Sequence, residues 1–137
     1  MSLERFIDAQ ARVWPTPQEE IQAGQKRSHW MWFIFPQLRG LGQSAMAQRY
    51  GIADLDEARA FLAHPVLGPR LNEITHAMLT HGDQSPEAVL GPVDAMKLRS
   101  CLTLFQAAGG DAIFGEALRV FYEGQPCEAT RSMIGAR

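Results

Sequence analysis

The stretch KRSHWMWFIFPQLRGLG combines side chains that can do chemistry with a dense run of large apolar ones. His29 can transfer a proton or hydrogen-bond a ligand. Trp30 and Trp32 can stack on a planar group while their indole N–H groups bind a polar partner. Lys26 and Gln37 flank the run and offer an ammonium and an amide. The stretch therefore fits a hydrophobic core, a ligand site, or both.

The run between Ser28 and Pro36 is predicted to form a short central helix. As a strand it would be apolar on both faces and would need neighbouring strands, and no other segment has a convincing strand pattern. Ser28 would cap the helix and Pro36 would end it. His29 would take the first helical position, where the helix dipole favours a neutral imidazole. Lys26, Arg27 and the first N–H groups form a candidate anion site there, with a solvated basic turn as the alternative.

A second pair of chemical groups lies far along the chain. Asp94 and Lys97 are three residues apart, at the start of a predicted helix over residues 92–108. On their own they are an exposed ion pair that contributes little to stability. If this turn packs against the tryptophan helix, His29, Asp94 and Lys97 form a candidate catalytic acid–base set. The candidate ligand-binding residues are Lys26, Ser28, Trp30, Trp32 and Gln37.

The other reactive side chains form no metal or nucleophile motif. His76 and His81 are five residues apart, about 140° around a helix, so they do not share a face that could bind a metal. Cys101 and Cys127 lack CxxC spacing and are predicted to be free thiols. The glycine-bearing loop QLRGLGQS matches neither a P-loop nor a dinucleotide fingerprint. We expect no metal and no cofactor.

The composition limits the classes of partner. Thirteen Lys and Arg against fifteen Asp and Glu give a net charge of −2, so no overall field favours nucleic acid or an anionic membrane. No apolar run approaches the roughly 20 residues of a membrane span, and MSLERFIDAQ is unlike a secretory signal. We expect a soluble cytoplasmic protein with no nucleic-acid or membrane partner, while homo-oligomerisation stays open.

Helix signals recur along the whole chain. At 137 residues and 46% hydrophobic, the chain fits one compact domain that buries about two-thirds of its unfolded surface. Apolar residues follow helical spacing, and Ser, Asp, Pro and Gly stand where helices begin and end. Ser44, Asp54 and Ser85 are predicted to cap helices, and Gly51 is predicted to end one in a left-handed conformation. We therefore predict an all-α fold over residues 1–137, an irregular orthogonal bundle of about seven or eight helices.

Several segments together resemble a known family. KRSHWMWFIFPQLRGLGQS, YGI, HPVLGPRL and DAMKLRSCLTLF occur at the separations seen in the uncharacterised family called domain of unknown function 1810, and the resemblance spans essentially the whole chain. It implies a small, mostly helical protein without an established activity, so no catalytic role transfers. Where a serine pair is expected before TLF, this chain has Ser100 followed by Cys101 and Leu102. The positions that match the family pattern are Lys26, Ser28, His29, Trp30, Trp32, Pro36, Gln37, Asp94 and Lys97.

Two hypotheses from different classes follow. In the first, a pocket at the N-terminal end of the tryptophan helix binds a small molecule: a tryptophan stacks a planar group such as a nucleobase, and Lys26 or Lys97 binds an anionic group. His29 with Asp94 would then transfer a proton. In the second, exposed tryptophan edges and the loop over residues 37–43 form a non-catalytic module for a protein partner or self-association. The convergence of polar groups favours the first.

Overall fold

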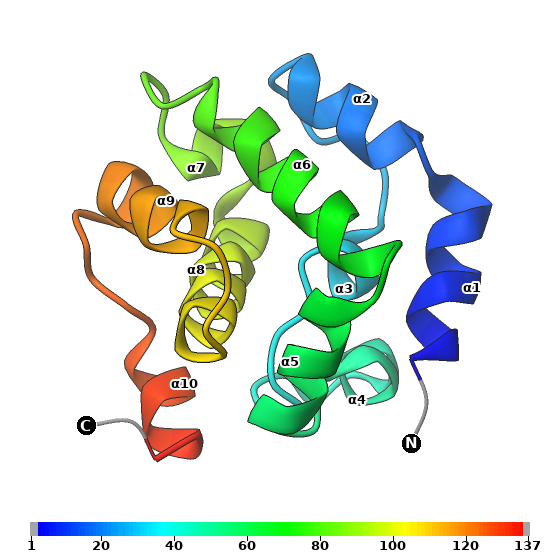
Figure 1. Cartoon of the computed structure of the whole chain (residues 1–137). Coiled ribbons are helices and arrows are strands. Elements are labelled where there is room, and N and C mark those ends of the chain that lie inside the picture. The colour runs from blue at the N-terminus through cyan, green and yellow to red at the C-terminus, as the bar shows by residue number, and fades with distance from the viewer. Residues whose placement is uncertain (1–2, 136–137) are drawn as a thin grey trace.

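The computed structural model describes residues 3–135, which form ten α-helices joined by short connections (Figure 1). The all-α prediction is confirmed, although the described residues contain more helices than the seven or eight expected. None of these helices has both the length and the apolar character that a membrane-spanning segment needs. The helices are α1 (Glu4–Val13), α2 (Thr16–Gln22), α3 (Met31–Ile34), α4 (Ala45–Tyr50), α5 (Leu55–Ala63), α6 (Leu67–Leu79), α7 (Pro86–Leu90), α8 (Pro92–Ala107), α9 (Ile113–Tyr122) and α10 (Glu128–Met133).

A row of aromatic rings joins helices from both halves of the chain. Phe6 of α1 meets Phe61 of α5 edge to face, with 5.2 Å between ring centres. Phe61 continues to Phe105 of α8 at 5.3 Å, and Phe105 to Phe114 of α9 at 5.9 Å. All four rings are fully buried. Such pairs each contribute about 0.5–1.5 kcal/mol beyond simple burial, so the Phe61–Phe105 contact helps to hold α8 against α5.

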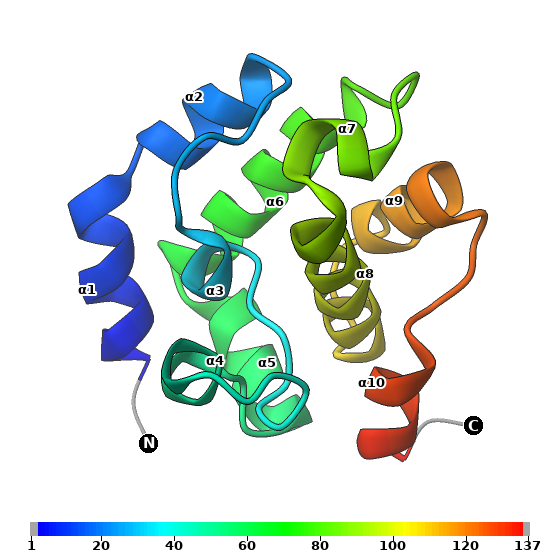
Figure 2. The same ribbon diagram turned by 180° about the vertical axis from the view of Figure 1, so that it is seen from behind.

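Helix α3 lies among the other helices, as Figure 2 shows, and it is shorter than predicted. It begins at Met31, with Trp30 at the N-cap position and no side-chain cap. The prediction that Ser28 caps this helix is wrong, because the Ser28 hydroxyl instead donates to the Glu20 carboxylate at 2.6 Å. His29 accordingly precedes the helix and does not occupy its first turn.

The direction of α8 is set by a sharp turn at its start. Gly91 has φ of 86° and ψ of 159°, a region open essentially to glycine alone, and Pro92 follows at the first helical position. The helix then packs against α5, α7, α9 and α10. Its first turns carry Asp94 and Lys97 toward α3, while its later turns enter the core.

The C-terminal segment is fastened to α8 by polar contacts. Arg99 Nε donates to the Gln125 carbonyl at 2.8 Å, and the Tyr122 hydroxyl donates to the Ala95 carbonyl at 2.5 Å. Helix α10 packs mainly on α8 and lies at the opposite side of the molecule from α1 in both ribbon views. A cavity lies between α8, α10 and the loop after α3.

Candidate functional site

The loop before α3 is organised by Glu20 of α2. Its carboxylate accepts hydrogen bonds from the backbone N–H groups of Arg27 and Ser28, at 2.8 and 3.0 Å, and from the Ser28 hydroxyl. It also accepts the indole N–H of Trp30 at 2.9 Å. Burial alone raises the pKa of Glu20, but these hydrogen bonds outweigh it and lower the pKa to about 2. Ser28 and Trp30 therefore use their side-chain donors within the protein.

Of the two tryptophans in the stretch before Pro36, only Trp32 reaches the surface. Trp30 is 0% exposed, so its ring offers no face to a ligand, and the Lys26 ammonium lies 4.9 Å from its centre. Trp32 is partly buried, and the Lys97 ammonium lies 5.1 Å from its ring centre. Each tryptophan thus has a lysine over its face, but only the Trp32–Lys97 pair is open to solvent.

Asp94 joins the two lysines, as the packing of α8 against the tryptophan segment allows. Its carboxylate lies 2.9 Å from Lys26 Nζ and 3.8 Å from Lys97 Nζ. The Lys26 side chain is 8% exposed and also donates to the Ser28 carbonyl at 2.6 Å, so it is committed to the structure. The Lys97 side chain is 24% exposed and its contact with Asp94 is long. Lys97 is therefore the cation available to a ligand.

His29 is exposed on the loop before α3. Among the described residues it has no hydrogen bond or ion pair, including none with Asp94 or Lys97. The structure thus brings two members of the predicted acid–base set to the tryptophan segment without linking the third to them. Proton transfer by His29 stays a prediction.

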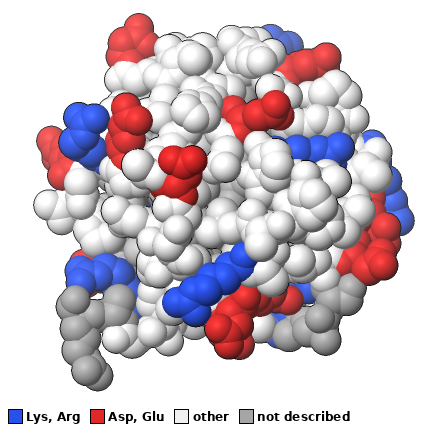
Figure 3. All heavy atoms as spheres, viewed as in Figure 1, with Lys and Arg blue, Asp and Glu red and all other residues white. Residues whose placement is uncertain are grey.

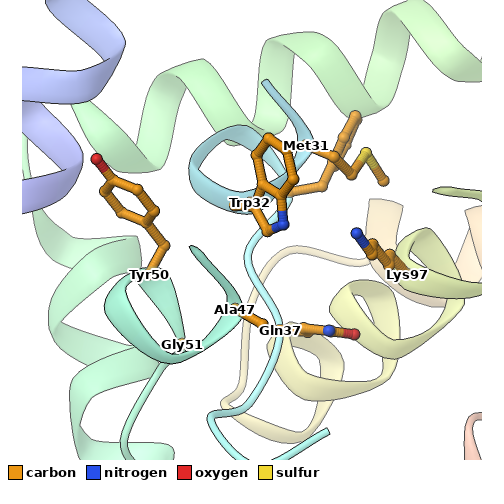
Figure 4. Close-up of a pocket in the computed structure, with 8 residues that line it drawn as sticks. Met31, Trp32, Gln37, Ala47, Tyr50, Gly51 and Lys97 are labelled. Carbon is orange, nitrogen blue, oxygen red and sulfur yellow. The ribbon is translucent and has the colours of Figure 1, made fainter. Parts of the chain in front are cut away.

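A narrow hollow lies beside Trp32. Figure 4 shows the Trp32 ring between Tyr50 of α4 and Lys97 of α8, with the Gln37 side chain below it reaching toward α8. The hollow measures about 10 Å³, which is room for roughly one water molecule. It is too small to hold an organic ligand, but it adjoins a larger space that shares Gln37 and Lys97.

The larger space is a cavity of about 510 Å³ between the loop after α3, the start of α8 and the start of α10. This volume falls within the usual range for small-molecule sites, about 300–1,000 Å³. The polar residues that line it include Gln37, Lys97, Arg99, Ser100 and Cys127. Its apolar walls include Leu41, Val93, Met96, Pro126 and Ala129.

Arg99 and Lys97 differ in how many contacts their charged groups already make within the protein. The Arg99 guanidinium donates to the Gln125 carbonyl at 2.8 Å and lies 5.7 Å from the Tyr122 ring centre. Glu128 also lines the cavity, as an exposed carboxylate at the start of α10. Positive charge in the cavity is therefore concentrated at Lys97, with Arg99 as a second and less mobile contributor.

Sequence reasoning missed Glu20 and the whole α10 side of the cavity. Glu20 is one of two adjacent acidic residues on a short helix, and nothing local ties it to Trp30 ten positions later. Cys127 is 27 positions from Ser100, the residue whose hydroxyl it faces. Both cysteines are free thiols, with Cys101 fully buried. Over residues 3–135, no cluster of three or more His, Cys, Asp or Glu could hold a metal ion.

Figure 3 shows the face that Figure 1 presents, with acidic and basic side chains interspersed over it and wide uncharged areas between them. No continuous basic area occupies this face. This distribution agrees with the net charge of −2 and offers no phosphate-binding track on the side that is seen.

A family model described as "Protein of unknown function (DUF1810)" matches residues 1–134. The chain belongs to the DUF1810 family. A similar solved structure is the crystal structure of the conserved hypothetical protein Rv1873 from Mycobacterium tuberculosis, with 46% identity and a TM-score of 0.95. That match covers 98% of this chain and 97% of the other. No functionally curated protein matches the chain. The family and the similar structure thus identify the fold and assign no activity to it.

Proposed function

We propose that this protein binds a small organic anion with an apolar body in the cavity between the loop after α3, α8 and α10. The observation that carries the proposal is the position of Lys97. Its ammonium is partly exposed, lies over the Trp32 ring, and lines both the narrow hollow and the 510 Å³ cavity. A cation at the edge of an apolar space fits a ligand that has one charged end.

The contacts available suggest how such a ligand would lie. Its anionic group would approach Lys97 Nζ, whose 3.8 Å contact with Asp94 is too long for a strong hydrogen bond and costs little to weaken. The Gln37 amide would offer a second polar contact. The apolar body would lie against Leu41 and Met96, removing their side chains from water. Charge-assisted hydrogen bonds of this kind contribute about 1.5–3 kcal/mol.

The proposed site differs in position from the pocket that the sequence predicted. The sequence predicted a pocket at the N-terminal end of the tryptophan helix, whereas the cavity is lined by residues that follow the C-terminal end of α3. His29 and Asp94 do not line the cavity, and Asp94 is already paired with two lysines. Acid–base catalysis by these two residues therefore forms no part of the present proposal.

The test is a binding screen on wild-type protein and a Lys97→Met variant. Thermal shift against aromatic carboxylates, nucleotides and sugar phosphates should identify a stabilising anion, and calorimetry should then give its affinity. We expect Lys97→Met to weaken the affinity about tenfold or more, because it removes the charged hydrogen bond. The matched control is Arg119→Met, an exposed cation on α9 that should leave the affinity unchanged. Absence of any stabilising anion, or equal affinities for wild type and Lys97→Met, would contradict the proposal.

A second candidate function rests on the rim of the same cavity. Val93 is 65% exposed and Met96 is 72% exposed, although both are large apolar side chains on the first turns of α8. Exposed apolar residues around a hollow also suit a protein partner or a second copy of the chain. Sedimentation of wild type and a Val93→Ser/Met96→Ser double variant separates the candidates. Concentration-dependent association that the double variant abolishes would favour the interaction module.

A further inference from the structure

One wall of the cavity carries a thiol held in a fixed position. Cys127 is partly exposed at the N-cap position of α10. Its backbone N–H donates to Thr103 Oγ1 at 2.9 Å, and the Thr103 hydroxyl in turn donates to the Arg99 carbonyl at 2.8 Å. The Cys127 backbone is thus anchored to α8, and Cys127 lines the same cavity as Lys97 and Arg99.

The Ser100 hydroxyl contacts the Cys127 sulfur, and the Thr130 hydroxyl lies near it. Ser100 Oγ lies 3.3 Å from Sγ and also 3.3 Å from the Met96 carbonyl, so its single proton can move from the carbonyl to a thiolate. Thr130 is fully buried and its hydroxyl has no hydrogen-bond partner among the described residues. A buried hydroxyl without a partner destabilises the folded chain. A thiolate at Cys127 would satisfy it.

These contacts favour the reactive form of the thiol. Burial raises the pKa of Cys127, but the hydrogen bond from Ser100, together with the nearby Thr130 hydroxyl and two backbone N–H groups, outweighs burial and brings the pKa below its ordinary value. Cys101 is the natural comparison, because it is fully buried and burial raises its pKa well above the ordinary value. A thiolate is the nucleophile in thiol chemistry, so we expect Cys127 to be the reactive cysteine and the buried Cys101 to be inert.

The size and charge of the cavity that Cys127 lines determine which reaction partners fit it. It is large enough for a small organic molecule, and Lys97 and Arg99 both line it, against the single exposed carboxylate of Glu128. We propose that Cys127 is a nucleophilic thiol that forms a mixed disulfide with a small, carboxylate-bearing disulfide bound in this cavity. The inference rests on the proposed function in one respect, since it uses the same cavity and the same lysine.

The reaction is a thiol–disulfide exchange and needs no further reagent. The Cys127 thiol first loses its proton to solvent, with Ser100 and Thr130 donating to the resulting thiolate. The thiolate then attacks one sulfur of the bound disulfide, so that one S–S bond forms as the original S–S bond breaks. The leaving thiolate takes the electron pair and is protonated by solvent. With Cys101 buried, the described residues offer no exposed second thiol to displace the adduct, so the mixed disulfide persists until an external thiol removes it.

The test measures the rate of this exchange on the full-length protein. Native protein is treated with dithiobis(nitrobenzoate), which carries two carboxylates, or with neutral hydroxyethyl disulfide, and the unfolded chain in urea gives the reference rates. We expect one adduct per native chain, located on Cys127 by mass spectrometry, and faster reaction than in the unfolded chain. The native protein should also prefer the anionic disulfide by about fivefold more than the unfolded chain does, which is the size expected for one exposed charge pair.

Variants distinguish a thiol that the surrounding residues activate from one that is only accessible to solvent. Lys97→Met should remove the preference for the anionic disulfide, and Arg119→Met should keep it. Ser100→Ala should move the midpoint of the pH–rate profile upward, and Thr130→Val gives an independent version of the same test. The proposal is overturned if native Cys127 reacts no faster than the unfolded chain, if the profile does not move in either hydroxyl variant, or if Lys97→Met leaves the preference intact.

The thiol proposal and the proposed function can fail separately. Cys127→Ser should abolish the adduct, and reversible binding of organic anions is measured on wild-type protein whose thiols are kept reduced. If reduced wild-type protein binds those anions while its Cys127 reacts no faster than the unfolded chain, the thiol proposal alone is wrong. If no anion binds reversibly and Lys97→Met still changes the disulfide preference, the proposed function of reversible anion binding is wrong and the thiol proposal stands.

Discussion

Removing the Glu20 carboxylate should destabilise the protein through the buried indole of Trp30. In a Glu20→Ala variant, water can replace the carboxylate for the exposed N–H of Arg27 and in part for Ser28. It cannot easily reach the Trp30 N–H, because Trp30 is 0% exposed. An unsatisfied buried donor costs about 1–3 kcal/mol and each partly solvated hydrogen bond about 0.5 kcal/mol, so we expect a loss of about 3 kcal/mol. Glu19→Ala, which removes the exposed neighbouring carboxylate, is the matched control.

The pH dependence gives the same prediction a second readout. The folded pKa of Glu20 is lowered from 4.5 to about 2, so its contribution to stability is fully present above the unfolded pKa and is lost as the pH falls through the folded one. Urea unfolding of wild type and Glu20→Gln should therefore differ at neutral pH and converge between about pH 4.5 and pH 2. A Glu20→Ala loss below about 0.5 kcal/mol, within the range of an ordinary surface substitution, or a wild-type advantage that does not change with pH, would refute the reasoning.

Three further predictions are checked by the same unfolding measurement. Lys26→Met should cost about 2 kcal/mol, because Asp94 then keeps only its long contact with Lys97; a loss near zero would show that the pair is fully solvated. Burial raises the pKa of Glu57, but hydrogen bonds led by Arg5 lower it, so Glu57→Gln should lower stability at neutral pH and the difference should vanish in acid; a constant difference would contradict this. Gly91→Ala should cost about 1–3 kcal/mol through backbone strain alone, since no atom lies within 4 Å of the added Cβ, and an unchanged stability would exclude the positive φ.

Local signals predicted most of the helices because helix ends depend on nearby residues. Ser44, Asp54 and Ser85 were predicted to cap helices, and each side chain accepts the backbone N–H three positions on. The local rule failed at Ser28, where a tertiary contact with Glu20 takes the hydroxyl. It failed also at Gly51, which was expected to end a helix with positive φ but has φ of −66°.

Gly51 is needed for a different reason, which the sequence does not display. A Cβ at this position would lie 2.5 Å from Arg39 Cα, so glycine allows two backbone segments to approach closely. The pairing of Ile52 with Leu38 lies beside this contact. Such an approach joins residues 12 positions apart, and only the folded chain shows it.

The sequence predicted several residues of the candidate site but not how they are arranged in space. The sequence identified Trp32, Lys97 and Gln37, and all three line the hollow beside α3. It could not separate Trp30 from Trp32, because burial of one ring and exposure of the other depend on which helices surround them. It did not anticipate Cys127, because α10 reaches the cavity through packing on α8 and through no pattern in its own sequence.

The most direct test of the central claim is to locate a bound anion by amide NMR. The anion that stabilises the protein best is titrated into isotope-labelled wild type and Lys97→Met. Binding in the proposed cavity should shift the amides of residues 37–42, the first two turns of α8 and the start of α10, with saturation in wild type and little change in the variant. Shifts confined to the α1 and α6 side of the molecule, or shifts of equal size in Lys97→Met, would contradict the account.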